Sequence, residues 1–186
     1  GMTKEIQRVE RAIEIALSGG DCAIVSSGDA GIYAMAGLAL ELCRSRSISL
    51  IPARKSKLDQ SDGQKTGSDL VIEVVPGIPA LCAGAALLGA PLTHDFATIS
   101  LSDLLTPWET IEARIEAAAR ADFVIVLYNP KSKKRDWQLK AAQEIVLRHR
   151  SPDTPVGIVT AAMRAEQAVR LISLQDLGQA PVGMQT

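Results

Sequence analysis

Aromatic residues, net charge and cysteine are all scarce in this chain of 186 residues. Aromatic side chains make up 3% of the chain, which argues against a stacking platform for single-stranded nucleic acid. The formal net charge of −1 argues against a surface built to hold duplex phosphates, so we expect no nucleic-acid partner. No apolar run reaches the ~18 residues of a membrane-spanning helix, so we expect no membrane partner.

Cysteine and histidine are too few and too scattered for a disulfide framework or a zinc site. Cys22, Cys43 and Cys82 form no Cys-x-x-Cys pair, and the chain has two histidines. We therefore expect three buried free thiols and no bound metal. No signal-peptide pattern is found, so we expect a cytoplasmic protein.

Helical and strand-like patterns alternate along the chain, which predicts an α/β layered protein with mainly parallel sheets. Apolar residues at helical spacing from Ile6 to Leu17 predict a first helix. Short continuous apolar runs predict strands buried on both faces, at 22–25, 47–52, 70–75, 96–101, 123–127, 156–159 and 168–174. We expect a lobe of residues 1–100, a lobe of residues 101–186, and a mobile polar loop at 53–69.

The helices between these strands have recognisable beginnings. Helices are expected from about residue 32 to 43 and from 80 to 88. Thr106 and Glu109 fit a capping box, with Pro107 at the first helical position, and Ile111, Ile115 and Ala118 would face the core. A further helix through Leu139 is expected to be capped by Asp136.

Four predicted strand ends carry unusual residues, at 26–31, 76–80, 128–130 and 160–162. In open α/β sheets, ligands bind beyond such carboxyl ends. The first two loops contain Gly, Ser, Asp and Pro but no Lys or Arg, and they match neither the P-loop nor the dinucleotide fingerprint. They suit a polar, uncharged or cationic ligand, such as a nucleoside or a sulfonium, while a plain tight turn is the alternative.

A basic cluster follows the third strand end. Cations at a helix N-terminus oppose the helix dipole, so their presence favours an anionic substrate such as a polycarboxylate. A solvated start of a helix is the alternative, and no catalytic acid, base or nucleophile stands out. The candidate substrate-binding residues are Lys131, Lys133, Lys134, Arg135 and, after the next strand end, Arg164.

Several longer motifs resemble those of the tetrapyrrole methylases, and among them the enzymes that methylate C17 of precorrin-3B. The most specific run is 99–108 (ISLSDLLTPW), and the others are 25–37 (VSSGDAGIYAMAG), 73–77 (EVVPG), 127–130 (LYNP) and 154–159 (TPVGIV). The resemblance implies a two-lobed fold, S-adenosylmethionine as methyl donor, and methyl transfer to C17 of precorrin-3B, a tetrapyrrole of the cobalamin pathway. The acetate and propionate groups of that substrate would account for the basic cluster.

The resemblance also assigns residues to the cofactor by their position in the motifs. The residues that it implies are Ser27, Gly28, Asp29, Ile32, Pro79, Ala80, Asn129 and Ala162.

Family members begin with an additional strand and glycine-rich loop, and they continue further at the other end. The resemblance therefore implies an incomplete first lobe, whose exposed edge a homodimer is expected to cover. We expect weak or no methyl transfer by this chain alone. Another enzyme of the same fold and an inactive dimerising fragment are the alternatives.

Overall fold

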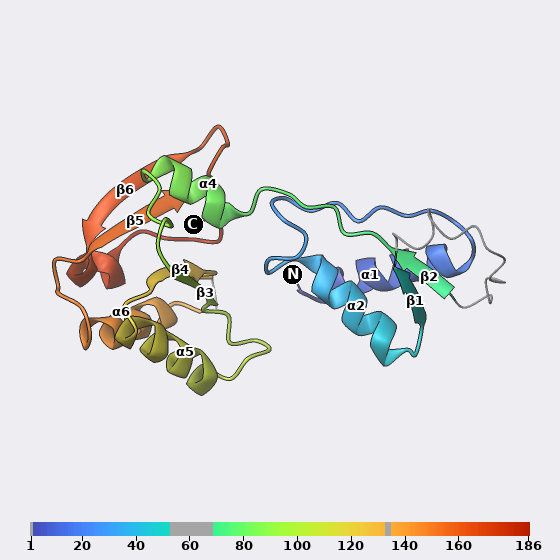
Figure 1. Ribbon diagram of the computed structural model, residues 1–186, viewed down its shortest axis with the longest axis horizontal. Helices are drawn as coiled ribbons and strands as arrows, with labels where there is room; N and C mark the ends of the chain where they lie inside the picture. The colour runs from blue at the N-terminus through green and yellow to red at the C-terminus, as the bar shows by residue number, and fades with distance from the viewer. Residues whose placement is uncertain (1, 53–68, 133–134) are drawn as a thin grey trace. The chain divides into compact units, whose positions relative to one another are not determined.

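The structure, a computed structural model, describes residues 2–52, 69–132 and 135–186. Its contacts group the chain into two compact units, Gly1–Pro79 and Ala80–Thr186, which we describe separately. Both units combine helices with two-stranded sheets (Figure 1), so the predicted α/β class is confirmed. The predicted lobes, which divide at residue 100, stay a prediction, and the polar stretch at 53–69 lies outside the described residues except for Asp69.

The first unit contains two helices and a pair of parallel strands. These are α1 (Met2–Leu17), α2 (Met35–Ser45), β1 (Ser49–Pro52) and β2 (Asp69–Ile72). The middle of the apolar stripe on α1 is buried, whereas Ile6 and Leu17 near its ends remain exposed. The small core of this unit consists of Val9, Ile13, Ala39, Cys43 and Leu70.

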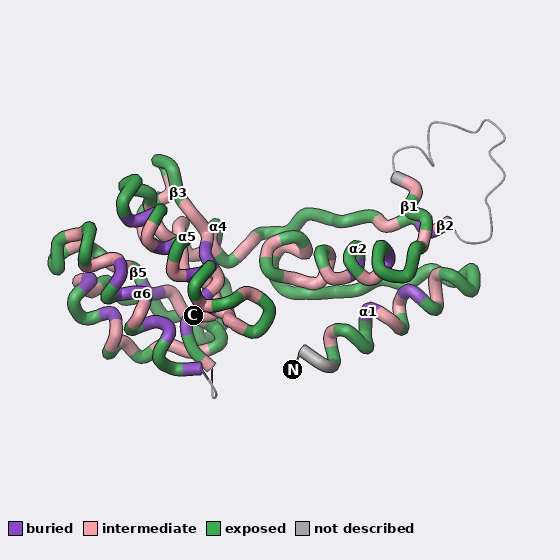
Figure 2. The backbone as a smooth tube through the Cα atoms, turned by 90° about the horizontal axis from the view of Figure 1, so that it is seen from below, coloured by how far each residue is buried: buried purple, intermediate pink, exposed green. Residues whose placement is uncertain are grey.

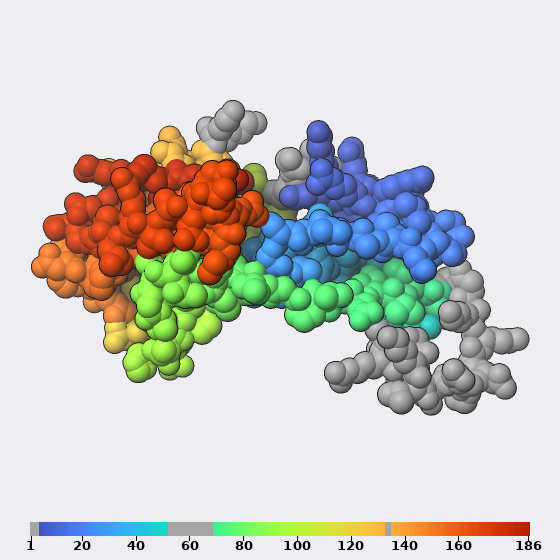
Figure 3. Space-filling model, turned by 90° about the horizontal axis from the view of Figure 1, so that it is seen from above, coloured from blue at the N-terminus to red at the C-terminus, as the bar shows by residue number. Residues whose placement is uncertain are grey.

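The apolar run at 22–25 is not a strand, so this prediction was wrong. The segment follows an exposed path in Figure 2, and Val25 is 86% exposed. A strand needs a neighbour to pair its backbone N–H and C=O groups, and no described strand pairs with this segment. Strand β2 also ends early, at Ile72, and the chain continues on the surface to the loop at 76–79, within the green band of Figure 3.

The second unit contains the larger set of elements. Strands β3 and β4 are parallel, with Phe96 opposite Val124, and strands β5 and β6 are antiparallel. The elements are α4 (Ala80–Leu87), β3 (Phe96–Ser100), α5 (Trp108–Arg120), β4 (Val124–Tyr128), α6 (Gln138–Leu147), β5 (Pro155–Thr160), β6 (Ala168–Ser173) and the 3-10 helix η1 (Leu174–Gln179).

The core of the second unit lies around α5, α6 and β3. Ile111, Ile115 and Ala118 of α5 are buried, as their helical spacing predicted. Leu101 and Leu139 pack into the same cluster. Burying one such aliphatic side chain contributes about 1.5–3 kcal/mol, so this core fixes the ends of β3 and β4 firmly.

Both predicted helix caps in this unit were wrong. Helix α5 begins at Trp108 with Pro107 as its N-cap, and no described side chain caps it, so Thr106 lies outside the helix. The backbone of Pro107 (φ −54°, ψ 143°) already has the extended geometry of an N-cap. Helix α6 has Trp137, not Asp136, at its N-cap, and the Trp137 ring packs edge-on against Trp108 with ring centroids 4.7 Å apart.

The expectation of three buried thiols was correct only for Cys43. Cys22 and Cys82 are exposed, and all three cysteines are free. Cys43 lies in the core of the first unit, where burial raises the pKa of its thiol. Cys43 is therefore expected to be unreactive, whereas Cys22 and Cys82 are accessible to reagents.

Candidate functional site

Asp29 ties together two of the predicted ligand loops in the first unit. Its carboxylate accepts hydrogen bonds from the Gly77 N–H, at 3.0 Å, and from the Gly31 N–H, at 2.7 Å. These two backbone donors, Gly77 first, lower the pKa of the Asp29 carboxyl. Asp29 therefore stays ionised and holds the loop at 26–31 beside the loop at 76–79.

Glycine lets these two loops meet backbone to backbone. Gly28 has φ 79°, in the left-handed region that favours glycine. A Cβ atom on Gly77 would lie 2.1 Å from the Gly28 carbonyl oxygen, so a side chain at position 77 requires the loops to separate. The paired loops thus offer exposed backbone groups and one carboxylate, which suits a polar or cationic ligand.

Four of the eight predicted cofactor residues belong to this pair of loops, and a fifth, Ile32, follows the first loop directly. Two of these five are exposed and three are half-buried, so a ligand can reach the loops from solvent. The exposed residues are Ser27 and Gly28, and the half-buried ones are Asp29, Ile32 and Pro79.

In the second unit, the end of β4 links two further predicted residues. Asn129 is held in a left-handed conformation (φ 55°), and its Nδ2 donates a hydrogen bond to Ser100 Oγ at 3.0 Å. Next to it, the Tyr128 hydroxyl accepts a hydrogen bond from the Leu81 N–H at 2.9 Å. Ala80, at the start of α4, is therefore tied to the end of β4 that carries Asn129.

Ala162, the last predicted cofactor residue, lies in a strained turn after β5. Its neighbours Ala161 and Met163 have φ of 49° and 61°, which is costly for residues that carry a Cβ. Ala161 is buried, and its N–H donates to the Gln185 carbonyl at 2.9 Å. Backbone strain of this kind collects at ligand sites, which agrees with the predicted role, although that role stays a prediction.

The predicted substrate cations have different surroundings. Lys131 and Arg164 are exposed and accessible to a ligand. Arg135 is buried, with 7% of its surface exposed, and its Nη2 donates to the Asn129 carbonyl at 3.0 Å. Lys133 and Lys134 lie outside the described residues. Arg135 is therefore buried and hydrogen-bonded within the protein, whereas Lys131 and Arg164 are exposed to a ligand.

A polar network beneath these loops was missed at the level of sequence. The Gln138 side chain, 2% exposed, donates from Nε2 to Asp103 Oδ2 at 2.9 Å. Ser100 Oγ accepts from the Ser102 N–H at 3.2 Å as well as from Asn129. Ser100 and Asp103 belong to the 99–108 motif, which at the level of sequence indicates only a family resemblance. The hydroxyl and carboxyl groups of this motif were the sequence signal that could have indicated the network.

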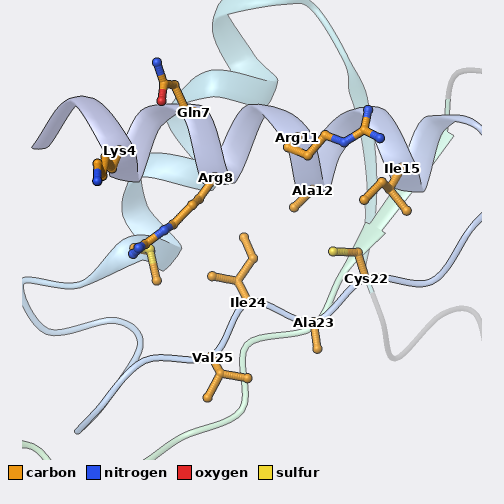
Figure 4. A pocket seen from close by; sticks show the side chains of 11 residues that line it. Lys4, Gln7, Arg8, Arg11, Ala12, Ile15, Cys22, Ala23, Ile24 and Val25 are labelled. Carbon is orange, nitrogen blue, oxygen red and sulfur yellow. The ribbon is translucent and has the colours of Figure 1, made fainter.

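A separate pocket of about 550 Å³ lies in the first unit between α1 and the segment at 22–25 (Figure 4). None of the predicted site residues lines it. The pocket is lined by cationic, neutral polar and apolar side chains: Lys4, Gln7, Arg8, Arg11, Ala12, Ile15, Cys22, Ala23, Ile24, Val25 and Met35. The pocket therefore adjoins the unpaired apolar segment and not the glycine loops.

Residues 2–52, 69–132 and 135–186 contain neither a metal-holding cluster nor a membrane-spanning helix. No group of three His, Cys, Asp or Glu side chains is arranged there to hold a metal ion. No helix within the same ranges is long and apolar enough to cross a membrane.

Comparison with known proteins gives consistent results along the chain. The model of the family "Tetrapyrrole (Corrin/Porphyrin) Methylases" matches residues 63–178. The chain is 47% identical over 184 residues to the "Probable cobalt-factor III C(17)-methyltransferase" of Salmonella typhimurium, covering 99% of this chain and 68% of that protein. It is 48% identical over 186 residues to the "Cobalt-factor III methyltransferase" of Priestia megaterium, covering 100% of this chain and 32% of that protein.

Solved structures agree with this result. The methyltransferase CobJ superposes with a TM-score of 0.78 at 34% identity, covering 97% of this chain and 68% of that chain. The uroporphyrin-III C-methyl transferase of Thermus thermophilus, complexed with S-adenyl homocysteine, shares the fold with a TM-score of 0.60 at 18% identity, covering 96% and 69%. The chain thus spans between about a third and two thirds of the length of the two curated relatives.

Proposed function

The chain belongs to the tetrapyrrole methylase family, and we propose that it takes part in S-adenosylmethionine-dependent methyl transfer to C17 of a corrin precursor in cobalamin biosynthesis. The observation that carries the proposal is the 47% identity to the Salmonella relative over 99% of this chain, because the name of that relative gives methyl transfer to C17 of cobalt-factor III as its probable activity. The 34% identity and shared fold with CobJ support it along 97% of the chain.

The proposed cofactor contacts are considered unit by unit. In the first unit, Ser27, Gly28, Asp29, Ile32 and Pro79 would contact S-adenosylmethionine. In the second unit, Ala80, Asn129 and Ala162 keep the role that the resemblance implies. The loop chemistry fits this group, because exposed backbone N–H and C=O groups match its polar ends and the ionised Asp29 complements a sulfonium charge. When bound, the cofactor supplies an electrophilic methyl group, so the protein has only to bind, orient and exclude water.

The proposed substrate is a tetrapyrrole that carries several carboxylates. The exposed Lys131 and Arg164 would bind these carboxylates, together with Lys133 and Lys134 from the sequence prediction. Precorrin-3B and cobalt-factor III are the two candidate substrates, and the names of the Salmonella and Priestia relatives favour the cobalt-containing one. Cobalt would then enter as part of the substrate and not as a metal of the protein.

Assembly and location are further parts of the proposal. A homodimer would cover the unpaired apolar segment at 22–25, where Val25 is 86% exposed. A cytoplasmic location agrees with the two exposed free thiols, Cys22 and Cys82, since such thiols persist in a reducing compartment.

The proposal is tested with the full chain, S-adenosylmethionine labelled with ¹³C in its methyl group, and each candidate substrate in turn. Label at C17, located by NMR, is the expected result, and a parallel assay of the Salmonella relative tests the expectation that this chain alone transfers weakly. Label at another carbon would assign the chain to a different reaction of the same family. A chain that binds no S-adenosylhomocysteine in calorimetry would contradict the proposal and favour a non-enzymatic role.

A further inference from the structure

Arg135 has surroundings that do not suit a substrate-binding cation. It is 7% exposed, and its only described hydrogen bonds join it to its own loop. Its Nη2 donates to the Asn129 carbonyl at 3.0 Å, and among the described residues no carboxylate forms an ion pair with its guanidinium. A buried cation without an anionic partner is costly, so this arrangement requires an explanation.

The backbone of Arg135 also forms two hydrogen bonds, both with Ser132. The Ser132 N–H donates to the Arg135 carbonyl at 2.8 Å, and the Arg135 N–H donates to the Ser132 carbonyl at 3.2 Å. Together with the side-chain bond to Asn129, these contacts tie Arg135 to two residues that follow β4, Asn129 and Ser132. Arg135 therefore fixes the positions of Asn129 and Ser132 relative to each other.

Gln138, in the first turn of α6, adds a second buried polar group. Its Nε2 is held by Asp103, while its Oε1 and the Nε of Arg135 are buried without a hydrogen-bond partner in the described part of the chain. Gln138 Oε1 is a hydrogen-bond acceptor, and Arg135 Nε carries an N–H donor. Buried polar groups left incomplete in this way lower stability, and apolar residues would fill the space at less cost. Their presence points to a task other than stabilising the core.

We propose that Arg135 is a positioning residue: its guanidinium sets the left-handed turn at Asn129, and thereby the geometry of the cofactor-binding end of β4, and it does not bind substrate carboxylates. The proposal rests on the proposed function for the identity of the cofactor. One N–H of the guanidinium holds the carbonyl, while the rest of the planar group fills the buried space. Lysine at this position keeps the charge but lacks the planar group.

Two titrations distinguish positioning from carboxylate binding. S-adenosylhomocysteine is titrated by calorimetry, and uroporphyrin III, a tetrapyrrole rich in carboxylates, is titrated by fluorescence at several salt concentrations. The variants are Arg135→Lys, Arg135→Met and, as a control, Lys140→Met, which removes an exposed cation from helix α6, close to Arg135 in the sequence. Lys131→Met serves as the reference for losing a carboxylate contact.

Positioning predicts that Arg135→Lys and Arg135→Met each weaken S-adenosylhomocysteine binding on the order of tenfold, because neither side chain supplies the planar group that fills the space beside the Asn129 carbonyl. Both leave the salt dependence of uroporphyrin binding unchanged, whereas Lys131→Met makes it shallower and Lys140→Met changes neither titration. The proposal is overturned when Arg135→Lys behaves like the wild type and Arg135→Met makes the uroporphyrin salt dependence shallower.

NMR of wild-type protein labelled with ¹⁵N-arginine decides the question without any variant. The Arg135 Nε–H signal is expected to exchange slowly with solvent and to keep its chemical shift when uroporphyrin saturates the protein. A large shift on adding uroporphyrin would show a carboxylate contact and contradict positioning. Failure of the wild type to bind S-adenosylhomocysteine would count against the proposed function, while this signal and the uroporphyrin titration still decide the role of Arg135.

Discussion

Replacing Gly77 by alanine is expected to push apart the two loops that carry most of the first unit's predicted cofactor residues. The new Cβ atom would lie 2.1 Å from the Gly28 oxygen and 3.0 Å from its carbonyl carbon, whereas ordinary contact begins near 3.4 Å. Both neighbours are backbone atoms, so no side-chain rotation relieves the clash. The loops must separate by roughly 1 Å, which stretches the 3.0 Å hydrogen bond from the Gly77 N–H to Asp29 beyond a normal length.

The size of the effect follows from the cost of overpacking. Forcing extra atoms into a packed contact costs about 1–3 kcal/mol. At about 1.4 kcal/mol for each factor of ten in affinity, Gly77→Ala should weaken S-adenosylhomocysteine binding by about 5-fold to about 140-fold. Calorimetric titration measures this change directly, and a thermal melt of the same sample reports whether the unit remains folded.

Gly37→Ala is the matched control for this substitution. Gly37 lies in α2, and a Cβ there would meet no described atom within 4 Å. Alanine is favoured over glycine inside a helix by about 0.5–1 kcal/mol, so the variant should be slightly more stable and bind as the wild type does. Binding by Gly77→Ala as tight as that of Gly37→Ala would refute the reasoning that the contact of these two loops shapes the cofactor site.

Three further substitutions or modifications test the second unit and the core. The side-chain hydrogen bond from Arg148 is the largest of the contacts that lower the pKa of Glu116. Ionised Glu116 therefore stabilises the fold above about pH 4.3, and this stabilisation is lost as the pH falls through the lowered pKa. Glu116→Gln should therefore lower Tm at pH 7 and match the wild type near pH 2, in melts across that range. Gln143→Leu leaves two backbone carbonyls, including that of Leu174, without their donor, and should cost about 1–3 kcal/mol in urea denaturation. A maleimide should label two thiols of the native protein rapidly and Cys43 only after unfolding, as read by mass spectrometry.

Helix and strand types were predictable where a pattern reflects burial inside one element. The spacing of Ile111 and Ile115 predicted the buried face of α5, because a helix repeats every 3.6 residues whatever surrounds it. The same logic failed for the run at 22–25. Its apolar composition is typical of a buried strand, but a strand also needs a paired neighbour, and pairing depends on segments far away in the sequence.

The helix caps failed for a more local reason. Thr106 and Pro107 are both acceptable at a helix start, and the sequence does not decide which of two adjacent residues becomes the N-cap. In the structure the proline holds that position, since its restricted φ already matches the N-cap geometry.

The candidate site was predictable as a set of loops but not as a set of contacts. The loops at 26–31 and 76–79 carry the glycines and Asp29 that the ligand rule indicated, although no described strand ends directly before either loop. The link from Asp29 to Gly77 joins residues 48 positions apart, and no local pattern reveals it. Arg135 shows the same limit, because a run of cations predicts a solvated surface while packing of the start of α6 buries one member of the run.

Titration of the unmodified chain with S-adenosylhomocysteine tests the central claim most directly, since every proposed role of the loops depends on that ligand. We predict saturable binding at one site per chain, with a Kd in the micromolar range, by isothermal calorimetry. Absence of binding heat at millimolar ligand, from protein whose melt shows that it is folded, would contradict the account.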